Sequence, residues 1–391
     1  MEVLAAFDKC KDSLSAWEIC SLVQKTLYSE FGIENTKIAP LTDGGEGFVE
    51  ILTKAKGGTF HSVQAKDSLG EIKKAKIGIV SGEELDSSML DFMNLSASKK
   101  LAIVEMSSIV GLADLPVEKR DPWETSSFGV GELLWESSRL GADSILLGIG
   151  GSSTNDIGVG AMSALNIEFS DLHDRKIPFP APKFWSDIKE ISSVNKLHLP
   201  FIRIACDVTN PLLGKNGATF QFGPQKGLKP ESLSGMEEKI SNMSARLSLI
   251  LGKSLDLRNQ PGTGAAGGIG YGLNLFYDAQ FLAGFSLVEK WLELENRVRG
   301  SDLIITGEGR FDNTSLYGKG PYEIIRLASK YDKRVILMAG SVDEKALMKC
   351  KSEFSNVEIY AFGKKELSLQ ENLINAPKFV EEKVIEIFSE L

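Results

Sequence analysis

The chain has 391 residues, of which 42% are hydrophobic and 25% charged, and its formal net charge is −9. This length exceeds that of one typical core, so we expect two domains, and the composition is that of a globular protein. The acidic balance argues against a nucleic-acid partner, which needs basic surface, although a local pocket can still bind phosphate. The sequence has no N-terminal targeting segment and no apolar run of about 20 residues, which predicts a cytoplasmic protein without a membrane partner.

The cysteines and histidines show no spacing that is typical of a metal site. The four cysteines are therefore expected to be reduced, small and mostly buried side chains. The three histidines lie far apart in the sequence, which argues against a zinc centre.

Strands and helices alternate cleanly at the start of the chain. Ser15 and Glu18 have the spacing of a capping box, which predicts that a helix begins at about Ala16. The expected elements are a strand at 2–7, a helix at 16–31, a strand at 37–41 and a helix at 48–56. Two acids stand beside three glycines after the second strand, which is more than a turn requires.

The pattern changes at residue 59. Residues 61–65 and 71–80 predict two β segments joined by a turn at 67–70, and this is a hairpin rather than a strand–helix–strand unit. We place the start of the second domain here. Residues 82–98 are polar and are expected to be irregular.

The middle of the chain returns to alternation. The expected elements are strands at 101–106, 144–149 and 201–205, and helices at 129–140, 156–165 and 231–251. Between residues 168 and 200, prolines at every second position from 178 to 182 argue against a regular helix or a central strand.

One stretch, residues 146–156, combines a buried strand, three glycines and five polar side chains. The strand breaks at Gly150-Gly151, and a helix is expected to begin with Thr154, Asn155 or Asp156 as its N-cap. Free backbone N–H groups and the positive end of a helix dipole suit an anion such as phosphate. The simpler interpretation is a well-capped turn, and it would be preferred if this were the only such turn.

The C-terminal part alternates as the N-terminal part does. The expected elements are strands at 302–306, 334–339 and 357–361, and helices ending at 330 and spanning 378–389. The two ends of the chain therefore predict one α/β domain into which the middle is inserted.

Six of the predicted strands end in glycine or polar residues. These ends are Asp8-x-x-Lys11, Asp43-Gly44-Gly45-Glu46, Gly150-Gly151-Ser152, Asp207-Val208-Thr209-Asn210, Gly307-Glu308-Gly309-Arg310 and Gly340-Ser341. Because ligands bind outside the carboxyl ends of strands in open α/β sheets, we expect these residues to converge.

The residue types at these ends suit phosphoryl transfer. Glycine lets backbone amides approach a phosphate, and four cations can neutralise it: Lys11, Lys226, Arg310 and Lys319. Five carboxylates can hold Mg²⁺ or accept a proton from an attacking hydroxyl: Asp43, Asp156, Asp207, Glu308 and Asp312.

Other enzyme classes fit the sequence less well. No Walker A loop, protein-kinase catalytic loop or Gly-x-Ser-x-Gly elbow is present. Gly262 to Gly268 matches the letters of a dinucleotide-binding loop, which keeps an NAD-dependent oxidoreductase of a small hydroxy acid as an alternative. A polar run precedes that loop where a strand is required, so we favour a small-residue helix packed on another element.

Taken together, these motifs resemble the bacterial glycerate kinases of the type-1 family. The resemblance covers essentially the whole chain, from 11–16 and 43–47 through 148–156, 205–212, 223–227 and 262–268 to 305–312. It implies ATP-dependent phosphorylation of D-glycerate in organic-acid catabolism, giving 2-phosphoglycerate or, less in keeping with this class, 3-phosphoglycerate. It also implies an α/β fold with two domains, a discontinuous Rossmann-like parallel-sheet domain at 1–60 and 285–391 and a second α/β domain inserted at 61–284, with the active site in the cleft between them.

The resemblance also implies which residues act. Asp207, Asp43 and Lys11 are the catalytic candidates, and Asp207 and Glu308 are the candidates for binding Mg²⁺. The remaining candidates for binding substrate or phosphate are Ser13, Gly44, Gly45, Glu46, Gly150, Gly151, Ser152, Asn155, Asp156, Asn210, Gln225, Lys226, Glu308, Arg310, Asp312 and Lys319. The sequence makes no prediction of the oligomeric state.

This chain departs from the usual pattern of the family at a few positions. The first strand ends in Phe7-Asp8-Lys9-Cys10-Lys11 where Pro-Asp-Ser-Phe-Lys is usual. Ser126-Ser127 replaces a pair of threonines, Ile157 replaces a glycine and Thr314 replaces a glutamine. The acids, lysines and glycines are retained, so we expect an active enzyme.

Overall fold

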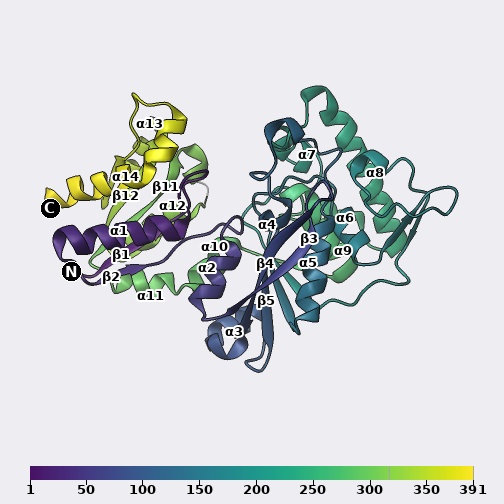
Figure 1. Cartoon of the computed structure of the whole chain (residues 1–391), viewed down its shortest axis with the longest axis horizontal. Coiled ribbons are helices and arrows are strands. Elements are labelled where there is room, and N and C mark those ends of the chain that lie inside the picture. Colours follow the sequence, from purple (N-terminus) through teal and green to yellow (C-terminus); the bar gives the residue numbers. More distant parts are fainter. Residues whose placement is uncertain (317, 391) are drawn as a thin grey trace. The chain divides into compact units, whose positions relative to one another are not determined.

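The structure is a computed structural model that describes residues 1–316 and 318–390. It divides into two compact units, Met1–Asp43 with Phe285–Leu391, and Gly44–Gly284 (Figure 1). The protein is thus an α/β protein with one parallel and one mixed sheet. The expected division assigned residues 44–60 to the first domain, whereas here they belong to the second unit, because helix α2 (Phe48–Ala55) packs on strands of that unit.

The first unit is built on a five-stranded sheet in the order β13-β12-β11-β1-β2. All neighbouring strands in it run parallel. The strands are β1 (Val3–Phe7), β2 (Thr36–Ile38), β11 (Leu303–Phe311), β12 (Arg334–Val342) and β13 (Val357–Ala361). In strand β1 every residue is buried, as expected for a strand that is covered on both faces.

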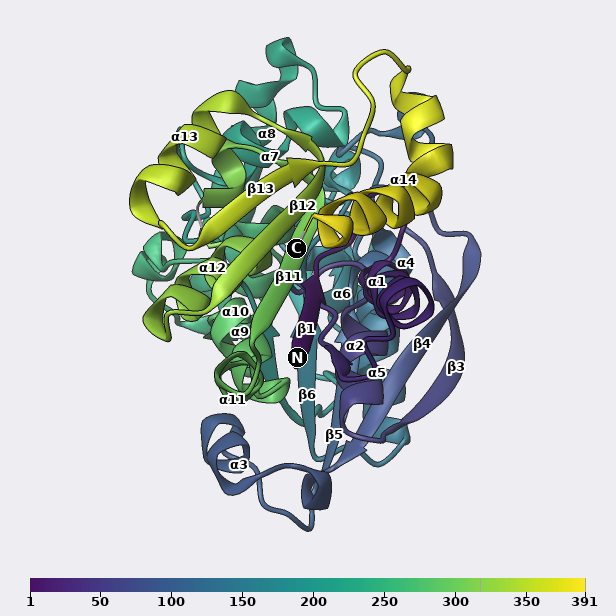
Figure 2. The same cartoon turned by 90° about the vertical axis from the view of Figure 1, so that its left-hand side faces the viewer.

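Helices cover both faces of this sheet. Helices α1 (Ala16–Phe31) and α14 (Leu369–Ser389) pack against each other over one face (Figure 2), and their apolar side chains share a core with Val3, Ala5 and Ile305. Helix α12 (Gly320–Lys330) packs on β1, β11 and β12. The remaining helices are α11 (Leu294–Arg299), α13 (Glu344–Glu353) and α10 (Gly284–Trp291), which begins at the boundary between the units.

The second unit contains a six-stranded mixed sheet in the order β10-β9-β6-β5-β4-β3. The pairs β3·β4 and β4·β5 are antiparallel and the other pairs are parallel. Its strands are β3 (Thr59–Lys66), β4 (Ile72–Ser81), β5 (Lys100–Glu105), β6 (Ser144–Gly148), β9 (Phe201–Ala205) and β10 (Gln280–Leu282). The strands β7 (Glu168–Ser170) and β8 (Glu190–Ser192) form a separate ribbon.

The helices of the second unit differ widely in length. They are α2, α3 (Ser87–Met93), α4 (Ser107–Val110), α5 (Phe128–Arg139), α6 (Val159–Ala164), α7 (Ala218–Phe222), α8 (Leu233–Leu251) and α9 (Ile269–Tyr277). Helices α5, α6, α8 and α9 contribute to the large core on one face of the sheet, and α2 contacts β4 and β5.

Most of the expected elements are confirmed. The capping box of Ser15 and Glu18 is present, and α1 spans the expected residues. The hairpin after residue 59 is confirmed as the antiparallel pair β3·β4. The expectation for residues 82–98 was wrong, because Asp86 caps helix α3 by accepting a hydrogen bond from the Met89 N–H. Helix α14 begins nine residues earlier than expected, at a second capping box of Ser368 and Glu371.

Two strands of the first unit run further than the sequence predicted. Strand β11 continues through Glu308 and Arg310 to Phe311, and β12 continues to Val342. Arg310 pairs with Ser341 in the same parallel register as the preceding residues. The glycine-rich motif after residue 306 is therefore part of the sheet and not a loop. The backbone of Glu308 is thus held in the sheet, which fixes the position from which its side chain extends.

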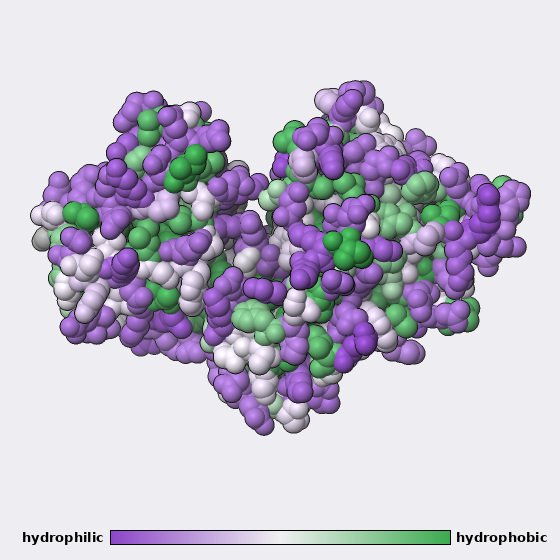
Figure 3. Space-filling model, in the orientation of Figure 1, coloured by the Kyte–Doolittle hydropathy of each residue, from purple (hydrophilic) through white to green (hydrophobic). Residues whose placement is uncertain are grey.

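The molecular surface is mainly hydrophilic on the face shown in Figure 3, with hydrophobic residues scattered among polar ones. Exposed apolar side chains such as Leu172, Val194, Leu249 and Met348 lie far apart in the sequence. In the described residues, no helix is long and apolar enough to cross a lipid bilayer.

Candidate active site

Two glycine turns of the second unit touch at the carboxyl ends of its strands. The Gly150 N–H donates a hydrogen bond of 3.0 Å to the Gly44 carbonyl oxygen. A Cβ atom on Gly150 would lie 2.8 Å from the backbone of Gly45, and one on Gly44 would lie 3.2 Å from the Ala205 carbonyl oxygen. Only glycine permits this approach, so the expected convergence of three strand ends is found here.

The loop after β6 is held tightly by the segment that follows β5. The Ser153 hydroxyl and N–H both donate to the Val110 carbonyl oxygen, at 2.8 and 2.9 Å. The Leu112 N–H donates to the Gly151 carbonyl oxygen at 2.8 Å. Ser152 and Ser153 are both buried. The loop is therefore a rigid feature of the unit.

The expected helix start at Thr154, Asn155 or Asp156 was wrong. Helix α6 begins at Val159 after Gly158, whose φ is 77°. Asp156 lies before the helix and its carboxylate accepts hydrogen bonds from the N–H groups of Gly158 and Gly160 and from the N–H and hydroxyl of Ser127. A buried carboxylate of the protein thus occupies the N-terminus of α6, where we expected an anion of the ligand to bind.

Asp156 therefore orders the loop in this structure, and its candidate roles as a phosphate or Mg²⁺ ligand remain predictions. Burial raises the pKa of its carboxyl group, and the hydrogen bonds from Ser127 and Gly160 oppose that rise. Close to it, Thr154 Oγ1 and Asn155 Oδ1 are buried without a hydrogen-bond partner among the described residues. Orphaned polar atoms of this kind point to a ligand or an ordered water at the loop.

Lys226 lies beneath the same loop. It ends the short 3₁₀ helix Pro224–Lys226, and its side chain is buried. Its ammonium group donates to Ser152 Oγ at 3.0 Å and to the Thr154 carbonyl oxygen at 2.7 Å. Burial lowers the pKa of Lys226 to about 7, and the nearby Asp156 opposes this. The Lys226 amine thus forms hydrogen bonds within the protein, and its expected contact with phosphate remains a prediction.

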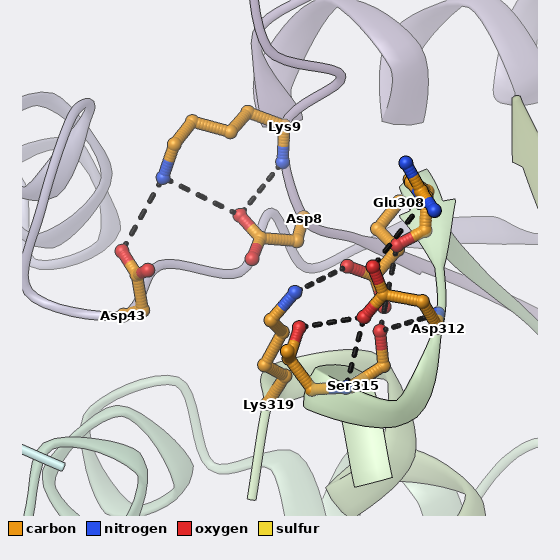
Figure 4. A network of polar contacts seen from close by, with 9 residues as sticks. Asp8, Lys9, Asp43, Glu308, Asp312, Ser315 and Lys319 are labelled. Atoms are coloured by element: carbon orange, nitrogen blue, oxygen red, sulfur yellow. Dashed lines mark hydrogen bonds and ion pairs between the residues drawn. The ribbon is translucent and has the colours of Figure 1, made fainter. Parts of the chain in front are cut away.

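A second cluster lies in the first unit, at the carboxyl ends of β1 and β11 (Figure 4). Lys9 Nζ is 3.8 Å from Asp8 Oδ1 and 3.3 Å from Asp43 Oδ1, so it bridges two carboxylates. The Asp8 side chain is 11% exposed, whereas that of Asp43 is 48% exposed. Burial raises the pKa of Asp8 to about 7; Lys9 opposes this rise, and Asp43 and Glu308 add to it.

Glu308 and Lys319 form the other half of this cluster (Figure 4). Lys319 is the N-cap residue of α12, and its Nζ lies 3.3 Å from Glu308 Oε2. Burial raises the pKa of Glu308, and the positive charge of Lys319 opposes that rise. Glu308 and Lys319 are both candidate site residues, and they are eleven positions apart in the sequence. The structure brings their side chains together.

Arg310 and Asp312 follow along the same strand end. The exposed Arg310 Nε lies 3.3 Å from Asp312 Oδ2. Asp312 Oδ1 accepts hydrogen bonds from the N–H and hydroxyl of Thr314, which lower the pKa of its carboxyl group. Arg310 is thus the more exposed member of this ion pair.

The other candidates fall into two groups. Ser13 and Asn210 have structural partners, because the Ser13 hydroxyl donates to the Leu373 carbonyl oxygen and the Asn210 amide donates to the Asn216 carbonyl oxygen. Four candidates are exposed: Lys11, Glu46, Asp207 and Gln225. A Cβ atom on Gly284 would lie 2.6 Å from Asp207 Oδ2, so this carboxylate lies against the start of α10.

The glycine run 262–268 is not a dinucleotide-binding loop. It follows the 3₁₀ helix Leu255–Asn259 and not a strand. The helix that we expected within it is also wrong, because Ala266, Gly267 and Gly268 all have positive φ. The close packing that we expected is present, since a Cβ atom on Gly267 would lie 2.1 Å from the Thr154 carbonyl oxygen.

Three residues of these sites were not among the site residues predicted from the sequence. Asp8 and Lys9 stand directly after the first strand, and their position was the available signal. Glu105 ends β5, and its carboxylate accepts hydrogen bonds from the Val49 N–H and the Ser107 hydroxyl. Glu105 belongs to β5 and yet accepts a hydrogen bond from the first turn of α2. No sequence pattern indicates this contact.

The carboxylates of the first-unit cluster offer the oxygen ligands that Mg²⁺ prefers. In residues 1–316 and 318–390, however, no group of three or more His, Cys, Asp or Glu side chains is arranged to hold a metal ion. Mg²⁺ is commonly bound through one or two carboxylates together with substrate phosphates, and this donor set fits that mode.

Comparison with known proteins yields one consistent family. The model of the Glycerate kinase family matches residues 3–391. The chain is 37% identical over 347 residues to a protein named Glycerate 2-kinase from Escherichia coli (strain K12), covering 88% of this chain and 86% of that one. It is also 37% identical to the Glycerate kinase of Haemophilus influenzae, over 88% of this chain and 87% of that one.

The solved structures agree. A crystal structure from Salmonella typhimurium LT2, assigned as glycerate kinase 2, superposes with a TM-score of 0.76 at 32% sequence identity. The match covers 100% of this chain and 98% of the other.

Proposed function

Because the chain belongs to the glycerate kinase family and is therefore a phosphotransferase, we propose that it transfers the terminal phosphoryl group of ATP to the 2-hydroxyl of D-glycerate. The observation that carries this proposal is the family match over residues 3–391. The choice of the 2-hydroxyl is supported by the identity of 37% to a glycerate 2-kinase. We place the reaction in the use of organic acids, where a three-carbon hydroxy acid is phosphorylated for further metabolism.

The charges at the two clusters support a reaction between anions. Both ATP and glycerate are negatively charged, and Lys9, Lys319 and Arg310 lie at the carboxyl edge of the parallel sheet. Glycine-rich backbone at Gly44 and Gly150 leaves room for an oxygen-rich group at the edge of the mixed sheet. We propose that residues of both units act in the same reaction.

The transferred phosphoryl group needs an acceptor oxygen that loses its proton. We propose that Asp43 accepts this proton, because its side chain is about half exposed and is held 3.3 Å from Lys9. Asp8, which is buried beside Lys9, then positions that lysine. Asp207 of the second unit remains the alternative base.

Glu308 would hold Mg²⁺, together with the nucleotide phosphates. When bound, the ion would neutralise charge on the transferring phosphoryl group. The protein itself binds the two substrates, orients the acceptor hydroxyl and excludes water.

A coupled assay with ATP, Mg²⁺ and D-glycerate tests the proposal, and NMR of the product identifies the phosphorylated hydroxyl. We expect Asp43→Asn to lower kcat by about 10²- to 10⁴-fold, the usual contribution of a general base. The matched control is Asp278→Asn, which removes an exposed carboxylate that is likewise paired with a lysine, Lys253, at 2.7 Å. No turnover of any short hydroxy acid by the wild type would reject the kinase proposal.

The same assay distinguishes the two candidate bases. If Asp207→Asn loses turnover and Asp43→Asn does not, the base belongs to the second unit and our assignment is wrong. If both variants lose turnover, residues of both units serve the reaction, as we propose. A product phosphorylated at the 3-hydroxyl would leave the kinase assignment intact and overturn the choice of hydroxyl.

A further inference from the structure

A buried arginine without an ion-pair partner among the described residues lies in the mixed sheet, with its side chain at the edge opposite to Gly150 and Ala205. Arg203 is the middle residue of β9, and 4% of its surface is exposed. Its Nη1 lies 3.5 Å from Ser144 Oγ, and its guanidinium carbon lies 4.5 Å from the centroid of the Phe201 ring. Among the described residues, no carboxylate oxygen lies within ion-pair distance of its guanidinium group.

This arrangement is costly without a further partner. A guanidinium group carries five N–H donors and stays charged at all physiological pH values. Arg203 uses one donor in a long hydrogen bond to a hydroxyl, and that hydroxyl itself donates to the Phe201 carbonyl oxygen at 3.0 Å. Burial lowers the pKa of Arg203. Buried charges are normally paired.

Two acids, Asp91 and Asp143, line the same cavity as Arg203, and Asp143 is already engaged. Asp143 Oδ1 accepts a hydrogen bond from Lys99 Nζ at 2.8 Å, and its Oδ2 accepts one from the Lys100 N–H at 2.9 Å. The pKa of Asp143 is lowered chiefly by the hydrogen bond from Lys99. Asp143 is therefore committed to the lysine side of the site and leaves the arginine unpaired.

Arg203 lines a cavity of about 690 Å³. The residues around it come from α3 and the segment that follows it, from the start of β5, and from the amino-terminal ends of β6 and β9 (α3 and β5 are labelled in Figures 1 and 2, and β6 in Figure 2). Leu90, Leu95 and Phe201 form apolar walls, Lys99 adds a second cation, and Asp91 and Asp143 add two carboxylates, of which Asp143 is paired with Lys99. The cavity thus lies at the edge of the sheet opposite to Gly150 and Ala205.

We propose that this cavity binds a small oxoanion, the phosphate or carboxylate group of a metabolite, with Arg203 as its principal partner. A planar guanidinium group matches both anions through two parallel hydrogen bonds. Stacking on Phe201 holds the plane of the guanidinium group, and the volume leaves room for a metabolite larger than the anion itself. The ligand would stabilise the unit at the edge remote from the phosphoryl-transfer residues.

Thermal unfolding in the presence of anions tests the proposal on the full chain. The melting temperature of the wild type should rise more in sodium phosphate or sodium malonate than in sodium chloride of equal ionic strength. Arg203→Met should melt at a higher temperature than the wild type in chloride, because an unpaired buried charge is removed, and should lose the greater part of the anion-specific rise. Arg139→Met, which removes an exposed arginine of α5 paired with Glu136, should retain the wild-type rise.

The two anions separate the two sources of ligand. A rise with phosphate alone assigns the cavity to phosphorylated metabolites, and a rise with malonate alone assigns it to carboxylic acids. Phosphate bound by the phosphoryl-transfer residues contributes equally to the wild type and the variant, so only their difference counts. An equal anion-specific rise in the wild type and Arg203→Met would overturn the proposal.

If Arg203→Met does not fold, a second variant tests the role of the Arg203 guanidinium group. Arg203→Lys keeps the charge and loses the planar pair of donors, so its anion-specific rise should fall below half of the wild-type value. A rise equal to that of the wild type would overturn the role of the guanidinium group. Kinase turnover by Arg203→Lys in phosphate-free buffer should stay within about twofold of the wild type, because the Arg203 side chain lies by Ser144 and Phe201, at the edge of the sheet opposite to Gly150 and Ala205.

Discussion

The ammonium group of Lys226 lies between the hydroxyl of Ser152, at 3.0 Å, and the carbonyl oxygen of Thr154, at 2.7 Å. It therefore joins the residue that follows the two glycines to the residue that precedes Asn155-Asp156. Since Lys226 is buried, it acts on the outside of the protein only through the loop that it holds. We regard it as a positioning residue of this loop.

Replacing Lys226 with Met should lower kcat/KM for glycerate by about tenfold to a hundredfold, because small displacements of a binding loop are costly in catalysis. Steady-state kinetics of the purified variant measure this. Lys215→Met, at an exposed lysine in the same part of the chain, is the matched control and should retain activity. Unchanged kinetics in Lys226→Met would show that the loop holds its position without the amine.

The same lysine makes the stability of the protein depend on pH. Its pKa is about 7 in the folded protein, against a usual value of 10.5, so between these pH values the unfolded chain binds more protons. The free energy of unfolding of the wild type should therefore rise with pH relative to Lys226→Met, by up to about 1.4 kcal/mol per pH unit. Urea unfolding at pH 6, 7.5 and 9 measures the difference, and parallel pH dependences of the two proteins would contradict it.

Asp8 should produce the opposite slope in the acid range. Its pKa is raised from 3.8 to about 7, so between these values the folded protein binds more protons than the unfolded chain. The free energy of unfolding should fall as pH rises from 4 to 7, and Asp8→Asn should remove that loss. Asp143→Asn is the control: hydrogen bonds lower the pKa of that carboxyl group, so its titration lies below this window and the variant should keep the wild-type slope from pH 4 to 7. Equal slopes for the two variants would refute the assignment.

Ile157 occupies a backbone conformation that suits glycine. Its φ is 47° although its side chain is β-branched and fully buried. Such a conformation costs a non-glycine residue about 1–2 kcal/mol. This conformation explains why glycine is usual at this position in the family. In this chain, Ile157 adopts it with backbone strain.

At position 157, glycine and alanine variants should have an unusual order of stability. Because the left-handed conformation disfavours Ala and not Gly, Ile157→Gly should be as stable as Ile157→Ala or more stable, although both leave a cavity. At Ile240, a buried position in helix α8, Ala should exceed Gly by about 1 kcal/mol. Chemical denaturation of the four variants gives the ranking, and the same order at both positions would rule out strain at Ile157.

Local sequence signals determined much of this fold. The capping box at Ser15 and Glu18, the apolar run of 3–7, and the left-handed Gly252 at the end of α8 each depend on residues near one another in the chain. Hydrogen bonding and hydrophobic periodicity within one element are local, so the sequence displays them. The grouping of strand ends could also be inferred, since parallel strands bring their carboxyl ends to one edge.

Only the tertiary structure decided what the polar residues at those ends do. Asp156 and Lys226 have the residue types of phosphate and metal ligands, but both are buried against backbone groups from distant segments. Asp8 became a site residue because Lys9 lies close to both Asp8 and Asp43, and Arg203 because it is buried without an ion-pair partner among the described residues. Burial and pairing depend on contacts between residues far apart in the chain, and these are set by packing and not by any short motif.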